Sequence, residues 1–148
     1  MGEIMKYLVL VSHGGFAEGL KTSLAMFAED KIDQVLAVGL ENGKSVDDFA
    51  VAFREAISGL TADDSVLVLA DIVGGSPLTT ACNVLAEVGK LDDATILGGM
   101  NLPMAVNSLV MKDVLEGSDL VSTVLGEASS ALQEFVIASD DDEDDDEI

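Results

Sequence analysis

A chain of 148 residues, 49% of them hydrophobic, is long enough for one domain with a sizeable core and too apolar to be disordered over most of its length. Its net charge of −21 argues against nucleic acid as a partner, because few basic residues are available to displace phosphate counterions, and favours a basic protein surface instead. No apolar run approaches the roughly 20 residues that span a bilayer, and the single cysteine, Cys82, excludes an internal disulfide.

The two ends of the chain indicate location and domain organisation. The N-terminal hexapeptide MGEIMK has no basic segment followed by a long apolar one, so we expect no secretory signal and a cytoplasmic location, which the single cysteine also suits. Eight acidic residues occupy positions 140–147, and the rest of the chain still carries a net charge of −13. A run of like charges is typical of a solvated segment. We therefore predict one domain over residues 1–139 and an acidic disordered tail over residues 140–148.

The first half of the chain predicts two strand–helix units. Continuous apolar runs at Tyr7–Val11 and Val35–Val38 predict strands buried on both faces, as in a parallel sheet. The first strand is followed by an amphipathic helix with an apolar face formed by Phe16, Leu20, Leu24 and Phe27. The second is followed by a helix that Ser45 caps and Gly59 ends, with an apolar face formed by Val46, Phe49, Ala50, Phe53 and Ile57.

The second half repeats this alternation and adds a short apolar remainder. Strands are predicted at Val66–Ala70 and Thr95–Leu97. One helix is predicted from Ser76 to Gly89, with Ser76 as its N-cap and Pro77 at N1. A second begins near Leu102-Pro103. A third runs from about Asp119 to Glu134, with an apolar side formed by Leu120, Val124, Ala128 and Leu132. The fragment Phe135–Ala138 has the character of a short extra strand, placed at a sheet edge or donated to a second subunit.

This alternation predicts an α/β fold. We expect three layers, α/β/α, around a mostly parallel, doubly wound sheet with a short C-terminal antiparallel edge strand. In open sheets of this kind, ligands bind beyond the carboxyl ends of the strands. Three strand ends carry unusual residues: Ser12-His13-Gly14-Gly15, then Asp71 followed by Gly74-Gly75-Ser76-Pro77, and finally Gly98-Gly99 with Asn101.

His13, the only histidine, and Asp71 converge if the first and third strands are neighbours, as in a flavodoxin-like order. A neutral imidazole is a nitrogen nucleophile at cytosolic pH, and a carboxylate that binds one ring nitrogen fixes the tautomer and supports positive charge on the ring. Gly14, Gly74 and Gly75 let backbone N–H groups approach an anion, and the helix that opens at Ser76 points its positive end at the same place. The pattern predicts phosphoryl transfer to His13.

Simpler interpretations exist for each residue. A lone histidine is more often structural or merely exposed, Asp71 could cap a turn, and paired glycines suit any sharp strand–helix turn. Other chemistries fit less well: Gly74-Gly75-Ser76-Pro77-Leu78 fails the G-x-S-x-G pattern of serine hydrolases, and a phospho-aspartate receiver would need acidic ligands where this chain has Ser12-His13. One histidine and one cysteine offer few metal ligands, and no P-loop is present. We expect no metal and no cofactor.

Taken together, VLVSHGGFAEGL, VLADIVGGSPLTTA and GGMNLPM resemble the enzyme IIA component of the mannose family of sugar phosphotransferase systems, which includes mannose, fructose, sorbose and N-acetylgalactosamine systems. The resemblance covers about residues 6–138, and the order and spacing of the three motifs make it specific. It implies a cytoplasmic phosphotransferase of bacterial sugar uptake. His13 would accept a phosphoryl group from the carrier HPr and pass it to enzyme IIB, which serves a membrane permease.

The resemblance also assigns individual residues. The family's aspartate falls on Asp71 and its phosphate-facing serine on Ser76, and a commonly exchanged C-terminal strand implies a homodimer through Phe135–Ala138. Val73 departs from relatives that carry an aromatic there, and the acidic tail is an extension. Phe16 and the Met100–Met104 loop are candidate partner contacts. Two alternatives stay open: a non-catalytic regulatory or anion-binding module of the same fold, and a dihydroxyacetone-kinase phosphocarrier, which has a reactive histidine but lacks the Gly-Gly-Ser-Pro pattern.

Overall fold

The computed structural model describes residues 4–138, and the predicted acidic tail over 140–148 lies outside the described residues. Strands alternate with helices along most of this range. The elements, in chain order, are β1 (Lys6–His13), α1 (Phe16–Leu24), the 3-10 helix η1 (Glu29–Gln34), β2 (Val35–Leu40), α2 (Val46–Ala56), β3 (Ser65–Ala70), α3 (Ser76–Glu87), β4 (Thr95–Gly98), α4 (Leu102–Met111) and α5 (Gly117–Ser130).

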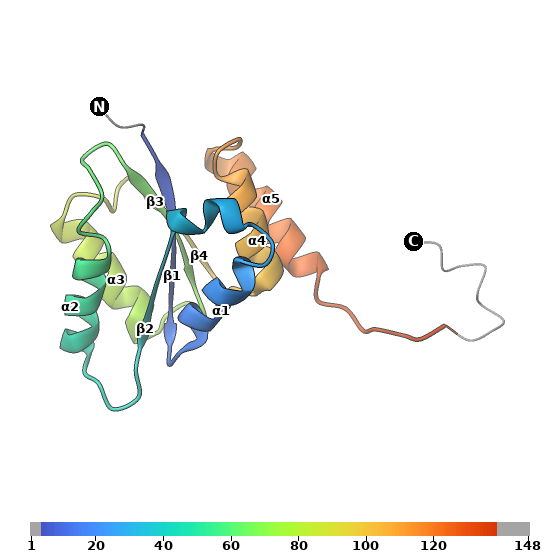
Figure 1. Ribbon diagram of the computed structural model, residues 1–148, viewed down its shortest axis with the longest axis horizontal. Coiled ribbons are helices and arrows are strands. Elements are labelled where there is room, and N and C mark those ends of the chain that lie inside the picture. Colours follow the sequence, from blue (N-terminus) through green and yellow to red (C-terminus); the bar gives the residue numbers. More distant parts are fainter. Residues whose placement is uncertain (1–3, 139–148) are drawn as a thin grey trace.

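The four strands form one parallel sheet in the order β2-β1-β3-β4, with β1 at its centre (Figure 1). Leu8 of β1 faces Val35 of β2 on one side and Leu67 of β3 on the other. Helices α2 and α3 cover one face of the sheet, and α1, α4 and α5 cover the other. The predicted three-layer α/β/α fold with a parallel sheet is therefore confirmed, and β1 and β3 are neighbours as expected.

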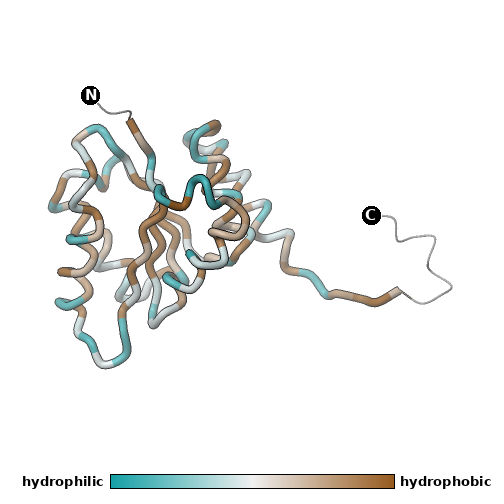
Figure 2. Tube along the Cα trace, viewed as in Figure 1, coloured by the Kyte–Doolittle hydropathy of each residue, from teal (hydrophilic) through white to brown (hydrophobic). Residues whose placement is uncertain are grey.

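Successive residues of each strand feed two separate cores, because side chains along a strand point alternately to the two faces. Leu8 and Leu10 of β1 are fully buried in the core beneath α1, α4 and α5. Val9 and Val11 are fully buried in the core beneath α2 and α3. Figure 2 shows that the strands in the middle of the molecule are hydrophobic. The continuous apolar runs of the sequence reflect this burial on both faces.

Helix boundaries agree with the sequence at some ends and differ at others. Ser45 caps α2 as predicted: its hydroxyl accepts from the Asp48 N–H at 3.0 Å, and the Asp48 carboxylate accepts from the Ser45 N–H at 3.1 Å. The predicted first helix ends earlier, at Leu24, so Phe27 lies beyond it and is 64% exposed. The short helix η1 was not predicted.

The C-terminal end of the described chain differs most from expectation. Helix α5 ends at Ser130 rather than near residue 134, which leaves Leu132 exposed. Within residues 131–138 no strand is formed, so the antiparallel edge strand predicted at Phe135–Ala138 is not part of this chain's own sheet. The segment runs away from the body as an extension that carries hydrophobic residues (Figures 1 and 2). A strand needs an edge to pair with, and this extension does not reach one. Between residues 4 and 138, no helix has the length and apolar character needed to cross a membrane.

Candidate functional site

His13 and Asp71 meet where two neighbouring parallel strands end. Val11 of β1 lies opposite Ala70 of β3, which brings the next residues of both strands to the same edge of the sheet. One carboxylate oxygen of Asp71, Oδ2, lies 2.8 Å from the His13 ring nitrogen Nδ1 and accepts a hydrogen bond from the His13 backbone N–H at 2.9 Å. The predicted convergence of these two residues is therefore present.

Hydrogen bonds hold the Asp71 carboxylate in its ionised form. Its second oxygen, Oδ1, accepts from the Ile72 N–H at 2.9 Å. Burial raises the pKa of the Asp71 carboxyl, but hydrogen bonds from His13 and Ile72 outweigh burial, so the pKa lies below its ordinary value. Because an ionised carboxylate can only accept, a neutral His13 ring carries its proton on Nδ1. The lone pair of Nε2 is then free to act as a nucleophile.

The imidazole is presented to solvent while its partner is shielded. The His13 side chain is 49% exposed and that of Asp71 is 16% exposed. One side of the ring packs against the start of α3, where a Cβ atom on Gly75 would approach the ring carbon Cε1. A ring held on one side and open on the other suits reaction with a group carried on the surface of another protein.

The four residues predicted to bind the phosphoryl group occupy two loops beside His13. Gly14 has a φ of +59°, and its N–H donates to the Leu40 carbonyl at 2.7 Å, so Gly14 shapes the turn with an N–H that is already used. Gly74 has a φ of +91°, which favours glycine. Gly75 is the N-cap of α3, and Ser76 is the first residue of that helix.

This arrangement corrects the predicted cap of α3. Ser76 was expected to be the N-cap, but the backbone at Gly75 is extended, with φ −91° and ψ 167°, and no side chain caps the helix. Ser76 is exposed at the opening turn, and its hydroxyl is not engaged in capping. The first N–H groups of α3 have no partner within the helix, and this positive end of the helix lies beside the His13 ring at Gly75.

The segment that follows β4, with Asn101, has a structural role rather than a chemical one. Asn101 caps α4, because its Oδ1 accepts from the Met104 N–H at 2.8 Å, and its Nδ2 donates to the Ala128 carbonyl of α5 at 3.2 Å. Met100 and Met104 are buried, so their side chains do not reach the surface, whereas residues 101–103 between them are half-buried. The partner contact expected of this loop stays a prediction. Phe16, the other expected contact, is 47% exposed at the start of α1.

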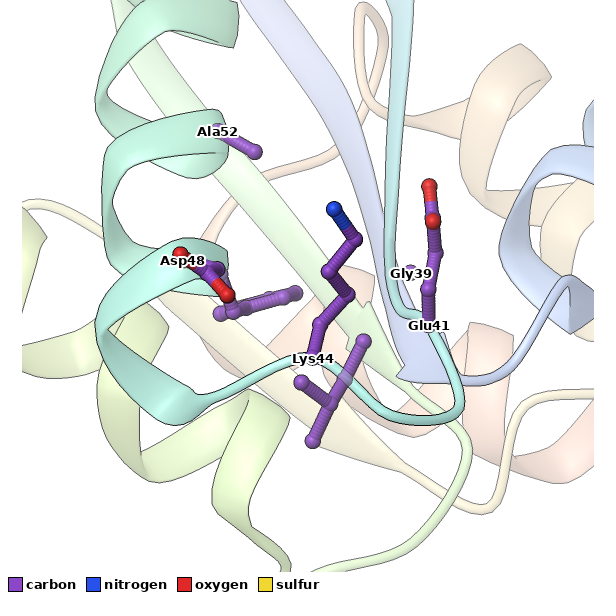
Figure 3. A pocket seen from close by; sticks show the side chains of 7 residues that line it. Gly39, Glu41, Lys44, Asp48 and Ala52 are labelled. Atoms are coloured by element: carbon purple, nitrogen blue, oxygen red, sulfur yellow. The ribbon is translucent and has the colours of Figure 1, made fainter.

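A small pocket lies next to this edge of the sheet, between the end of β2 and the start of α2 (Figure 3). It has a volume of about 130 Å³ and is lined by Gly39, Leu40, Glu41, Lys44, Asp48, Phe49 and Ala52. Leu40 is the register partner of His13, but neither His13 nor Asp71 lines the pocket. Its charged side chains have both signs. Within the described range, no group of three or more His, Cys, Asp or Glu side chains is placed to hold a metal ion.

Known protein sequences resemble this chain over most of its length. The family described as PTS system fructose IIA component, EIIA-man, matches residues 7–125. The PTS system fructose-specific EIIA component of Bacillus subtilis is 28% identical over 127 residues, which cover 85% of this chain and 84% of that protein. The PTS system mannose-specific EIIAB component of Escherichia coli K12 is 24% identical over 106 residues, 72% of this chain and 32% of that protein. The chain thus matches about a third of that longer relative.

Solved structures resemble the whole fold. A PTS IIA protein associated with the fucose utilization operon of Streptococcus pneumoniae superimposes with a TM-score of 0.74 at 27% identity, over 90% of this chain and 96% of that one. The phosphotransferase system component EIIA of Streptococcus agalactiae gives a TM-score of 0.72 at 26% identity, over 88% of this chain and 97% of that one.

Proposed function

Because the chain belongs to the mannose-type enzyme IIA family of the sugar phosphotransferase system, whose members are phosphocarriers, we propose that His13 is the residue that carries the phosphoryl group. The donor is phospho-HPr and the acceptor is the enzyme IIB component. The observation that carries the proposal is the 2.8 Å contact between His13 Nδ1 and Asp71 Oδ2, which leaves Nε2 as the nucleophile. The exposure of the ring supports transfer between proteins.

The transfer is a displacement at phosphorus. The lone pair of His13 Nε2 attacks the phosphorus atom of the donor phosphohistidine, a new N–P bond forms, and the donor's N–P bond breaks and leaves its electron pair on the donor ring. The proton on His13 Nδ1 stays in place, and the positive charge that develops on the His13 ring is stabilised by Asp71. The same steps in the opposite sense pass the group to enzyme IIB.

The start of α3 provides hydrogen-bond donors and positive charge for the negatively charged phosphoryl oxygens. We assign this task to the backbone N–H groups of Gly74 and Gly75 and to the N–H and hydroxyl of Ser76, which lie at the positive end of a helix beside the His13 ring. Gly14 contributes by shaping the turn after His13. No step requires a cofactor.

The remaining features of the proposal concern assembly and location. We propose that the unit over residues 1–139 acts in the cytoplasm and meets the membrane only through the permease complex that its enzyme IIB partner serves. The exposed extension that contains Phe135–Ala138 supports a homodimer in which this segment pairs with a second copy.

Reconstitution tests the proposal directly. The purified chain is incubated with labelled phosphoenolpyruvate, enzyme I and HPr, and the acid-labile label is located by mass spectrometry after mild digestion. We expect one phosphoryl group on His13 and none on His13→Ala, followed by transfer to enzyme IIB. Label on another residue, or full labelling of His13→Ala, would overturn the assignment. A binding module without catalysis would take up no label from phospho-HPr even in the parent chain.

A further inference from the structure

Ser12 is a fully buried polar residue that directly precedes His13. Its hydroxyl oxygen accepts a hydrogen bond from the Ala17 backbone N–H at 2.8 Å. The hydroxyl also donates to the Gly14 carbonyl at 3.4 Å, which is the longer and weaker of the two contacts. A single side chain therefore ties the last residues of β1 to the turn after His13 and to the first turn of α1.

Ser12 does the work of a missing helix cap. The first N–H groups of a helix have no partner within the helix, and a side-chain oxygen at the N-cap normally accepts from one of them. The N-cap of α1 is Gly15, which has no side chain to do this. The Ser12 oxygen supplies the bond from three residues further upstream, across the turn that contains His13.

Strand β2 holds the same turn from the other side. The Gly14 N–H donates to the Leu40 carbonyl at 2.7 Å. A Cβ atom on Gly39 would overlap the Gly14 carbonyl oxygen and would lie 3.6 Å from the Ser12 oxygen. Gly39 therefore leaves open the space into which the Gly14 carbonyl fits, beside the hydroxyl that donates to it.

We infer that Ser12 is a positioning residue for phosphoryl transfer, and that Gly39 supports it by leaving room for the Gly14 carbonyl to which the Ser12 hydroxyl donates. The inference rests on the proposed role of His13. The backbone N–H and the ring nitrogen Nδ1 of His13 reach the same oxygen of Asp71, at 2.9 and 2.8 Å, so a shift of the His13 backbone disturbs both contacts. Ser12 and Gly39 fix that backbone, and through it the direction in which Nε2 points.

The task requires a hydroxyl. Ser12 must accept from one backbone group and donate to another, which an alanine cannot do and a threonine can. Substitution by alanine also leaves the Ala17 N–H buried without its partner. Ser12→Ala removes the hydroxyl, whereas Ser12→Thr changes the side chain but keeps the hydroxyl. Comparing the two variants therefore distinguishes the loss of the hydroxyl from the effect of any substitution at this position.

The test reads the His13 ring directly, because His13 is the only histidine of the chain and gives one set of imidazole ¹⁵N signals. In the parent we expect the proton on Nδ1. In Ser12→Ala we expect a larger share of the Nε2-protonated tautomer and phosphoryl transfer from phospho-HPr slower by about 10- to 100-fold, the cost typical of a misplaced reacting group. Ser12→Thr should keep the parental tautomer and restore most of the rate.

Ser45→Ala is the matched control, because Ser45 also caps a helix through its hydroxyl but bonds to Asp48 rather than to the His13 turn. The inference is overturned if Ser12→Ala keeps the parental tautomer, or if Ser45→Ala slows transfer equally. If Ser12→Ala does not fold, Gly39→Ala decides: a shifted tautomer supports the inference, and a parental one overturns it. A parent chain that takes no label refutes the proposed function instead, and the tautomer measurement then shows only whether Ser12 orients the His13 ring.

Discussion

A Cβ atom on Gly75 would lie 2.8 Å from the ring carbon Cε1 of His13, so the imidazole packs directly against the backbone at the start of α3. Gly75→Ala must therefore displace the ring or the loop. We expect phosphoryl transfer to slow by about tenfold or more, because the nucleophile moves relative to the helix N–H groups that hold the phosphoryl oxygens. Labelling kinetics with phospho-HPr would measure the effect.

Gly126→Ala provides the control for this substitution. Gly126 lies inside α5, and a Cβ atom there meets nothing within 4 Å. Alanine is the better helix former, so we expect the free energy of unfolding to rise by about 0.5–1 kcal/mol with transfer unchanged. A Gly75→Ala variant as fast as Gly126→Ala would show that the ring does not depend on this contact.

Asp71→Asn tests the charge beside His13. The asparagine keeps a similar shape but removes the negative charge that stabilises the ring during attack, and its amide no longer dictates a proton on Nδ1. We expect transfer to slow by about 100-fold or more while the fold is kept. The exposed Asp63 offers a matched control, because Asp63→Asn removes the same charge at the opposite end of β3. Equal rates for Asp71→Asn and Asp63→Asn would contradict the prediction.

The sheet and the reacting pair were accessible from sequence because both follow from general rules. The runs Tyr7–Val11 and Val66–Ala70 are apolar at every position, as expected of short strands that are covered on both faces of a parallel sheet. Once the two strands are placed side by side, parallel direction alone puts their carboxyl ends at one edge. His13 and Asp71 therefore meet without any knowledge of the side-chain contacts.

Other features depend on local geometry that sequence patterns do not reveal. Ser12 is one polar residue in an apolar strand, and its importance appears only when the turn brings the Ala17 N–H back to it. Ser76 follows a glycine that takes the N-cap conformation itself, which moves the cap by one residue. Leu132 continues the apolar spacing of α5 although the helix has ended, because spacing does not encode where a helix stops.

Ser108 lies in α4 with a fully buried side chain, and its hydroxyl has no hydrogen-bond partner among the residues that the structure describes. A buried polar group without a partner destabilises the folded state. We expect Ser108→Ala to raise the free energy of unfolding by up to about 1 kcal/mol, as measured by urea denaturation. Ser122→Ala, at an exposed position of α5, should change it by less than about 0.5 kcal/mol. A loss of stability in Ser108→Ala would show that the hydroxyl is satisfied in solution.

Asp64 ties the N-terminal segment to the loop before β3. Its carboxylate accepts from the Thr61 N–H at 2.8 Å and from the Met5 N–H at 3.0 Å. The Thr61 bond, aided by the Met5 bond and by Lys90, lowers the pKa of Asp64 although burial raises it. A carboxyl with a lowered pKa in the folded state stabilises the protein above its unfolded pKa of about 4, and this contribution is lost as the pH falls through the folded value.

Asp64→Asn should therefore lower the free energy of unfolding by about 1–3 kcal/mol at neutral pH, because charge-assisted hydrogen bonds are lost. The difference from the parent should begin to narrow below about pH 4, where the unfolded chain takes up the proton, and should narrow further as the pH falls through the lowered pKa of the folded carboxyl. Urea denaturation over a pH series measures both values. A difference that stays constant into acid would show that the charge of Asp64 plays no part.

The extension after α5 is the segment through which we predict that two copies of the chain associate. Leu132, Phe135, Val136 and Ile137 are between 69% and 86% exposed, and β4 pairs with β3 along only one of its edges within the described sheet. If the extension pairs with a second copy, Phe135 and Ile137 lie on one face of the new strand, because they are two residues apart. We expect the parent to be dimeric by sedimentation equilibrium. The double variant Phe135→Asp with Ile137→Asp should shift toward monomer, since buried charges oppose the apolar contact.

Val51→Asp is the control, because Val51 is 62% exposed on α2, away from the extension, and its charge should leave the association unchanged. A parent that sediments as a monomer at all concentrations, or a double variant as dimeric as the parent, would rule out this segment as the link between subunits.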